Sequence, residues 1–191
     1  MTDRVFALFW ALIAGLRLGL FLQGRPAALP LALLSLLAAV RLVRRRPPSR
    51  EAPLPRRILA WGAALLPWGA GLFPAAASPA PLAAFGQALQ VLGVLLALWA
   101  LWALGEAFAV SPGDRGLTER GPYRLIRHPM YAGEIAAFAG WLLERPSAEG
   151  AALLAASVLL AVLRIRWEEE VIEGYAGYAR RVRWRLVPFL W

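Results

Sequence analysis

The 191-residue chain has no cysteine, no lysine, no asparagine and a single histidine, His128. Without cysteine, the protein has no disulfides, no zinc–thiolate sites and no cysteine nucleophile. A single histidine also excludes a metal site built from several histidines, so we expect no metal. Arginine supplies all 21 basic residues against 12 acidic ones, giving a net charge of +9. Such a basic chain is often a nucleic-acid binder, but here most arginines flank apolar segments, which favours membrane lipids as partners and excludes nucleic acid.

Apolar residues make up 60% of the chain and gather in six stretches. Four approach the ~20 residues that a bilayer crossing requires. The last two are shorter and are separated by a predicted tight turn at Glu144–Glu149, which predicts a helical hairpin. Arg17 interrupts the first stretch and no small-residue cleavage site follows, so we interpret it as a mature helix rather than a secretory signal. The six stretches are Val5–Leu22, Ala27–Val43, Ile58–Phe73, Leu82–Gly105, Ala132–Leu143 and Gly150–Leu163.

Arginine placement predicts how these stretches cross the membrane. Three basic segments, Arg41–Arg57, Arg115–Arg127 and Arg164–Arg185, alternate with loops that hold only Arg25 and Arg145. By the positive-inside rule, six crossings place both termini and the two later basic segments in the cytoplasm. The basic loop before the third stretch is expected to lie on anionic headgroups.

One polar segment stands between the fourth and fifth stretches and contains Gly121–Tyr131, with His128 near its end. Several helix breakers precede it, which predicts a folded loop. Such a cluster beside lipid costs free energy unless partners or a ligand satisfy it. His128 and Tyr131 would alternatively only cap the next helix. The clustering of Tyr123, Arg127, His128 and Tyr131 favours a ligand site instead.

A second constellation follows the last apolar stretch. Arg164 and Glu168 are four residues apart and share a helix face. They are either an ordinary intrahelical ion pair or, as ionisable groups at the exit of a membrane span, site residues; we favour the second interpretation. The next apolar residues recur at spacings of three and four, which predicts one amphipathic helix. They are Trp167, Val171, Tyr175, Tyr178 and Val182.

Three motifs together resemble a known family. They are Gly116-Leu-Thr-Glu-Arg-Gly-Pro-Tyr123, Arg127-His-Pro-Met-Tyr131, and Arg164 placed four residues before Glu168-Glu169. In this order and spacing they resemble the integral membrane methyltransferases that include isoprenylcysteine carboxyl methyltransferases and phosphatidylethanolamine N-methyltransferases. The resemblance covers about Gly113 to the C-terminus. Two departures are that Arg115 stands where the isoprenylcysteine branch often has histidine, and that the aromatic tail is shortened to Tyr175-Ala-Gly-Tyr178.

The resemblance implies a site for S-adenosylmethionine. Glu168 is implied at both the cofactor and the catalytic centre, and Arg164 is implied to position the substrate. The implied cofactor-binding residues are Arg115, Gly116, Leu117, Thr118, Tyr123, His128, Pro129, Met130, Tyr131 and Glu168.

The resulting prediction is an all-α integral membrane protein with five to six transmembrane helices, a short helical hairpin, a cytoplasmic motif loop and an amphipathic C-terminal helix. Residues 1–105 would form the N-terminal transmembrane helices and residues 106–191 the catalytic region. Methyl transfer from a sulfonium mainly requires positioning and exclusion of water, which suits a chain without metal or thiol.

The identity of the acceptor stays open at this point. Arg164 favours a lipophilic carboxylate from the bilayer, as in isoprenylcysteine carboxyl methylation. An amine acceptor, as in phospholipid N-methylation, would need a base such as Glu106, Glu119 or Glu134. An NADPH-dependent reductase of the sterol type and a small transporter or scaffold are the remaining alternatives.

Overall fold

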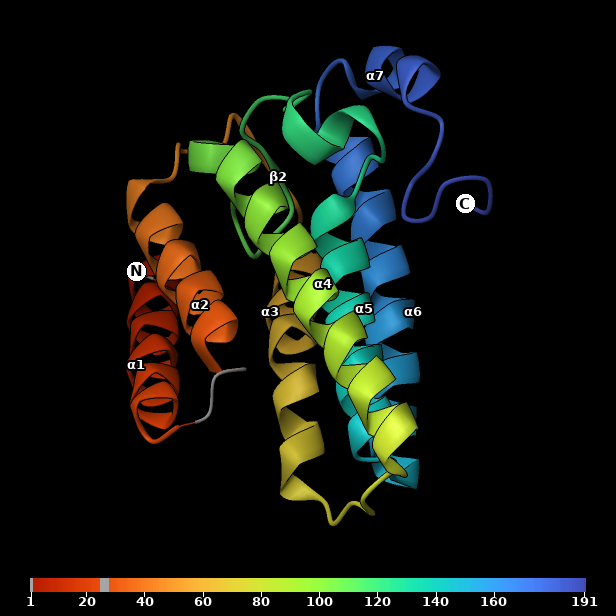
Figure 1. Cartoon of the computed structure of the whole chain (residues 1–191). Helices are drawn as coiled ribbons and strands as arrows, with labels where there is room; N and C mark the ends of the chain where they lie inside the picture. Colours follow the sequence, from red (N-terminus) through yellow and green to blue (C-terminus); the bar gives the residue numbers. More distant parts are fainter. Residues whose placement is uncertain (1, 25–27) are drawn as a thin grey trace.

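The computed structural model describes residues 2–24 and 28–191 and confirms the all-α class. Within these ranges, seven α-helices are joined by short 3₁₀ turns and one two-stranded antiparallel sheet (Figure 1). Arg25 and Ala27, which belong to two of the sequence predictions, lie outside the described residues. The helices are α1 (Thr2–Leu22), α2 (Ala28–Arg44), α3 (Leu54–Gly69), α4 (Ala80–Leu104), α5 (Pro129–Glu144), α6 (Ala148–Val171) and α7 (Tyr175–Arg181); the 3₁₀ turns are η1 (Ala70–Leu72), η2 (Gly105–Ala107) and η3 (Gly121–Arg124); the strands are β1 (Arg50–Glu51) and β2 (Gly113–Asp114).

The six apolar stretches correspond to the six long helices. Three segments of the described chain are long and apolar enough to cross a membrane, namely Val5–Leu22, Ala80–Ala107 and Ala148–Val171. The predicted hairpin is α5 and α6, with Ser147 accepting a hydrogen bond from the Gly150 amide at 3.0 Å as the N-cap of α6. Its second arm is longer than predicted, because α6 continues through the charged residues up to Val171.

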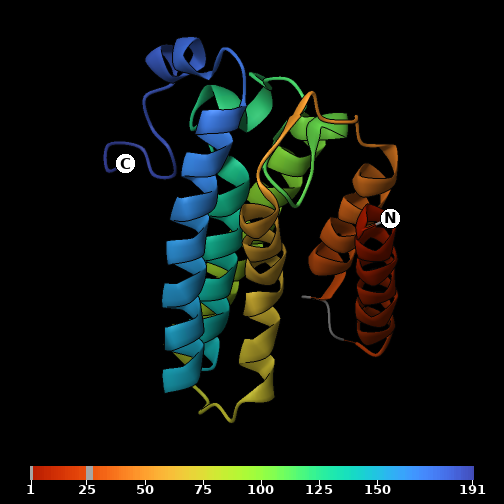
Figure 2. The same cartoon turned by 180° about the vertical axis from the view of Figure 1, so that it is seen from behind.

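Helices α3 to α6 stand side by side, and the α1–α2 pair lies against one side of them (Figures 1 and 2). A cluster of buried apolar residues joins the pair to the bundle, including Ala38 and Leu42 of α2 with Leu101 of α4. The motif loop and α7 gather at one end of the bundle, where α2, α4 and α6 also end (Figure 1).

Glycines allow α4 and α5 to pack backbone against backbone. A Cβ added at Gly93 would lie 2.5 Å from the Ala137 nitrogen, and one at Gly133 would lie 2.5 Å from the Gly93 oxygen. Gly86, seven residues earlier in α4, and Gly140, seven residues later in α5, form the same kind of contact, with a Gly140 Cβ only 2.5 Å from the Gly86 oxygen. Small residues that bring backbones close are typical of helix association in membranes. This contact holds α5 against α4, and His128 lies at the start of α5.

The prediction that a single helix carries the apolar stripe from Trp167 to Val182 is wrong. Helix α6 ends at Val171, and Gly174 adopts φ 73° before α7 begins at Tyr175. The left-handed conformation is accessible to glycine at little cost, so the chain turns there and α7 folds back over the loop. Tyr175, Tyr178 and Val182 still form one buried cluster. The three- and four-residue spacing therefore marks the buried side of α7. Trp167 and Val171 lie on a different helix, α6.

Candidate active site

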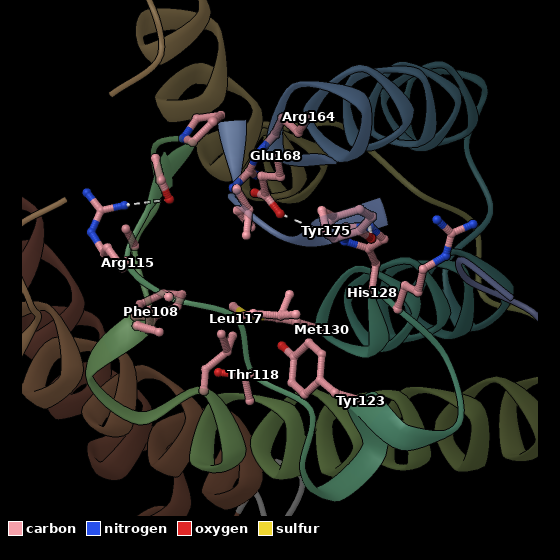
Figure 3. Close-up of a pocket in the computed structure, with 18 of the residues that line it drawn as sticks. Phe108, Arg115, Leu117, Thr118, Tyr123, His128, Met130, Arg164, Glu168 and Tyr175 are labelled. Atoms are coloured by element: carbon pink, nitrogen blue, oxygen red, sulfur yellow. Dashed lines mark hydrogen bonds and ion pairs between the residues drawn. The ribbon is translucent and has the colours of Figure 1, made fainter. Parts of the chain in front are cut away.

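A cavity lies beneath the motif loop, between the ends of α4, α5 and α6. Figure 3 shows Arg115 and His128 at opposite ends of this cavity, with Leu117 and Met130 between them. Glu168 and Arg164 come from α6, and Tyr175 comes from α7. All four tyrosines of the chain contribute to its wall: Tyr123, Tyr131, Tyr175 and Tyr178. The cavity thus collects residues from the end of α4, the motif loop, α5, α6 and α7.

The structure brings together nearly all of the residues predicted for the cofactor. Nine of the ten line this one cavity, and Arg164 lines it as well. Pro129 is the exception, because it begins α5 and is buried behind the wall. Phe108, Ser111 and Ile172 also line the cavity and were not predicted, because apolar and small residues carry no distinctive spacing. The nine are Arg115, Gly116, Leu117, Thr118, Tyr123, His128, Met130, Tyr131 and Glu168.

Asp114 holds the motif loop in place, although the sequence analysis did not identify it. Its side chain is buried, and Oδ1 accepts from the Gly116 amide at 2.9 Å while Oδ2 accepts from the Glu173 amide at 3.1 Å. Strand β2 then pairs with β1, Arg50 opposite Asp114, which ties the loop to the α2–α3 connection. Gly116 itself adopts φ 90°, a conformation suited to glycine. One carboxylate therefore connects the loop to the segment that follows α6.

Arg164, Tyr131 and Glu168 form a compact group on one wall. The Tyr131 hydroxyl donates to Glu168 Oε1, and the Arg164 guanidinium lies 4.8 Å from the centre of the Tyr131 ring. Arg164 is 8% exposed and donates from Nη2 to the Val110 oxygen at 2.8 Å. It therefore does not simply form the intrahelical ion pair that was the alternative interpretation. Its Nε has no hydrogen-bond partner among the described residues, which leaves a donor in reserve.

Glu169, rather than Glu168, is the centre of the polar network around His128. Its carboxylate accepts from Arg127 at 3.1 Å and from Arg185 at 3.0 and 2.9 Å, and lies 3.3 Å from His128 Nε2. The Tyr175 hydroxyl lies 2.9 Å from His128 Nε2 and donates to Glu169 at 3.1 Å. No pattern in the sequence assigns a separate role to Glu169. The only indication in the sequence is that Glu169 directly follows Glu168.

His128 occupies the N-cap position of α5, with φ −129° and ψ 58°, but its side chain makes no capping hydrogen bond. The imidazole instead lies between the two glutamates, with Nδ1 3.8 Å from Glu168 Oε2. Its backbone amide donates to the Arg185 oxygen at 2.9 Å. The C-terminal segment therefore pairs with the motif and holds the ring in place. Capping by the imidazole, the alternative interpretation, is not its role.

Three tyrosine hydroxyls outside the helical spans stay protonated. Burial, reinforced by nearby carboxylates, raises the pKa of Tyr123, Tyr175 and Tyr178 well above the usual value for tyrosine. Each is thus a hydrogen-bond donor at neutral pH. Tyr178 uses its hydroxyl to donate to the Tyr123 oxygen at 2.6 Å, which fastens α7 onto η3. Helix α7 therefore covers one end of the cavity.

The three predicted base candidates lie in different places. Glu106 pairs with Arg46 at 3.2 Å, and Glu119 pairs with Arg181 at 2.5 Å, both on the exposed rim. Glu134 lies one and a half turns into α5 and lines a smaller cavity together with Tyr131 and Arg164. It has no hydrogen-bond or ion-pair partner in the part of the chain that the structure describes. Tyr131 and Arg164 line this cavity and the main one, so they separate Glu134 from the predicted cofactor site.

Comparisons with known proteins identify the family of the chain. Residues 82–176, about half of the chain, match a protein family described as phospholipid methyltransferase. A solved structure of a eukaryotic intramembrane Ras methyltransferase, isoprenylcysteine carboxyl methyltransferase without a monobody, has a TM-score of 0.48 and 20% sequence identity to the chain, covering 95% of this chain and 74% of that one. A search of curated proteins found no match. The chain belongs to this family of integral membrane methyltransferases, and the family match spans the whole motif loop, α5, α6 and the start of α7.

Proposed function

We propose that the protein transfers a methyl group from S-adenosylmethionine to a lipophilic acceptor that reaches the site from the bilayer. The observation that carries the proposal is the single cavity at one end of an apolar helical bundle. It combines a carboxylate, Glu168, with a buried guanidinium, Arg164, and a wall of tyrosines. A membrane methyltransferase needs a water-poor meeting point for a polar donor and a greasy acceptor, and this location provides one.

The residues present fit the donor. Its methionyl carboxylate suits the buried guanidinium of Arg115, which is 6% exposed, since bidentate arginine–carboxylate pairs are strong. Its cationic groups suit Glu168, and the rings of Tyr123 and Phe108 offer flat apolar surfaces for an adenine. The cofactor supplies an already activated methyl group. The chain has only to orient the two reactants and exclude water.

The preferred acceptor is a carboxylate, as in isoprenylcysteine carboxyl methylation. Arg164 lines both the main cavity and the smaller one beside it, and its Nε has no hydrogen-bond partner in the described parts of the chain. A carboxylate is ionised at pH 7, so it needs a guide but no base. In this role Arg164 would position the carboxylate oxygen of the acceptor. Tyr131 would keep Glu168 oriented toward S-adenosylmethionine.

One observation favours a second candidate, an amine acceptor as in phosphatidylethanolamine N-methylation. Glu134 has no hydrogen-bond or ion-pair partner among the described residues, and it lines the cavity next to Arg164 and Tyr131. It also lines a larger cavity between the α1–α2 pair and α3–α5, together with Arg17 and Gln90. An ammonium group entering there would find a carboxylate to take its proton before attack. A carboxylate acceptor would thus depend on Arg164, and an amine acceptor on Glu134.

We further propose that the active site and both termini face the cytoplasm. The cavity, α7 and the basic segments lie at one end of the bundle (Figure 1). That end collects Arg41–Arg57, Arg115–Arg127 and the arginines from Arg164 onward, as the positive-inside rule requires. The cofactor is polar and would therefore reach its site without crossing the membrane.

The first test is binding of S-adenosylmethionine, S-adenosylhomocysteine and NADPH to the detergent-solubilised full chain, by calorimetry. Selective micromolar binding of the first two is expected. Response to NADPH alone would instead indicate a reductase, and no response to any of them a transporter or scaffold. His128→Ala and Glu168→Ala should weaken cofactor binding, whereas Arg164→Ala should preserve it and lower turnover. Equal loss of cofactor affinity in all three would overturn this division of roles.

The acceptors are then compared with matched variants. Turnover of a short prenylcysteine that depends on Arg164 but survives Glu134→Gln supports the carboxylate acceptor. Turnover of phosphatidylethanolamine that is lost in Glu134→Gln supports the amine acceptor. Cofactor affinity, measured in parallel, must stay the same in Glu134→Gln, because Glu134 does not line the cofactor cavity.

A further inference from the structure

A second, wider cleft lies beside the cofactor cavity, on the other side of the Arg115–Thr118 segment. Its volume is about 890 Å³, and it runs between the C-terminal ends of α2 and α4. Arg41, Trp102 and Arg120 are among its lining residues. None of these three lines the cofactor cavity. The two openings share Leu104, Ala107 and the Arg115–Thr118 segment in their lining, whereas Arg41, Trp102 and Arg120 belong to the cleft alone.

Two of its arginines lack acidic partners. The carboxylates at the cleft are already engaged, Glu106 by Arg46 and Glu119 by Arg181. In the described parts of the chain, neither Arg41 nor Arg120 is paired with a carboxylate. The cleft consequently carries an excess of positive charge.

The guanidinium groups of Arg41 and Arg120 approach the same backbone position, Gly105. A Cβ added at Gly105 would lie 3.2 Å from Arg120 Nη2 and 4.0 Å from Arg41 Nη1. Residue 105 is glycine, at φ 60°, so no side chain lies between the two nitrogens. Two guanidinium groups facing one space form a good recognition element for an oxyanion, which accepts several charge-assisted hydrogen bonds.

Both arginines are held in position by other contacts. The Arg120 Nε donates to the Ala103 oxygen at 2.8 Å, which satisfies a carbonyl in the last turn of α4. The Arg41 guanidinium lies 5.4 Å from the centre of the Trp102 ring. These contacts engage the Nε of Arg120 and one face of the planar Arg41 guanidinium. Terminal nitrogens of both side chains are left for a ligand, at a reduced entropic cost of binding.

The surrounding residues identify the source of the anion. The apolar segment Ala80–Ala107 ends at this cleft, where Trp99 is 50% exposed and Trp102 is 67% exposed. Exposed tryptophans at the end of a span lie at headgroup level, and arginines just beyond it attract anionic lipids. We infer that the cleft binds the phosphate of an anionic phospholipid between Arg41 and Arg120, with the acyl chains beside Trp99 and Trp102. This inference goes beyond the proposed function and does not depend on the methyl acceptor.

The test uses the full chain in detergent and dioctanoyl phosphatidylglycerol as the probe, with binding measured by native mass spectrometry. Dioctanoylglycerol, which lacks the phosphate, and inorganic phosphate, which lacks the chains, are the comparison ligands. Phosphatidylglycerol is expected to bind, and both comparison ligands to bind far more weakly. Arg41→Gln and Arg120→Gln should each weaken its affinity about fivefold. Arg44→Gln, an exposed arginine on the same helix that does not line the cleft, should leave it unchanged.

Several outcomes would overturn the inference. Equal binding of dioctanoylglycerol would show that the phosphate is not recognised, and displacement of the lipid by an equal concentration of inorganic phosphate would exclude a lipid-specific site. Loss of S-adenosylhomocysteine affinity with unchanged lipid binding in Arg120→Gln would assign the cleft to the cofactor. Arg41→Lys and Arg120→Lys keep the charge and guard against misfolding of the glutamine variants. They must retain more lipid affinity than the glutamine variants for the inference to stand.

Discussion

Tyr131 donates its hydroxyl hydrogen to Glu168 across the interface of α5 and α6. The tyrosine lies in the first turn of one helix and the glutamate in the last turn of the other. Because the Arg164 guanidinium also lies over the Tyr131 ring, one tyrosine orients both charged groups of this wall. The relationship links the arms of the hairpin at the point where the two substrates are proposed to meet.

Tyr131→Phe tests this link. The ring and its contact with Arg164 remain, but Glu168 loses its donor. A hydrogen bond to a charged group contributes about 1.5–3 kcal/mol, so we expect about a tenfold loss of S-adenosylhomocysteine affinity in calorimetry. The same hydrogen bond is present in the unliganded structure, so the melting temperature should fall as well. An affinity equal to that of the parent chain would show that Glu168 is oriented without Tyr131.

Glu169→Gln should destabilise the folded protein. The change weakens the partner of Arg127 and Arg185 and disturbs the bond to Tyr175. Arg127 is buried, and leaving a buried charge poorly paired costs roughly 3–5 kcal/mol. We therefore expect a clear drop in the melting temperature in detergent.

Glu170→Gln is the matched control for that prediction. The neighbouring glutamate pairs with Arg56 on the surface, where an ion pair contributes about 0–1 kcal/mol. Its melting temperature should stay close to that of the parent chain. Equal melting temperatures for the two variants would contradict a central role for Glu169.

Gly133→Ala should separate α4 from α5. The new methyl group would lie 2.5 Å from the Gly93 oxygen, and backbone cannot move aside as a side chain can. Overpacking of this kind costs about 1–3 kcal/mol. Gly62→Ala, in α3, has nothing within 4 Å of its added Cβ and should be neutral or slightly stabilising. Melting temperatures of the two variants provide the comparison, and a Gly133→Ala protein as stable as Gly62→Ala would refute the close contact.

Asp114→Asn should loosen the motif loop. An amide has only one acceptor oxygen in place of the two that serve Gly116 and Glu173, so one amide loses its partner at a cost of about 1–3 kcal/mol. Arg115 is buried in the parent chain and should be cut slowly by trypsin. Faster cleavage after Arg115 in the variant is the expected result. Unchanged cleavage, with Arg120 as the exposed internal reference, would argue that β1–β2 pairing alone holds the loop.

The sequence by itself determined the class of the protein and most of one cavity wall. Apolar stretches of fixed length must become helices in lipid, because every backbone polar group there needs an internal partner. Local motifs such as Arg127–Tyr131 keep their residues close for simple reasons of chain connectivity. The pair Arg164 and Glu168 follows equally from helical periodicity. These signals were sufficient to predict nine residues that the structure brings together.

Only the tertiary structure decided which polar groups meet across the chain. Glu169 became the centre of the His128 network because the C-terminal segment returns and pairs with the motif, placing Arg185 beside it. The break at Gly174 depends on one glycine in a left-handed conformation, and a three- and four-residue spacing does not reveal such a turn. The convergence of Arg41 and Arg120 at Gly105 likewise joins residues far apart in the chain. Long-range contacts of this kind depend on how the helices pack, and packing leaves no local pattern in the sequence.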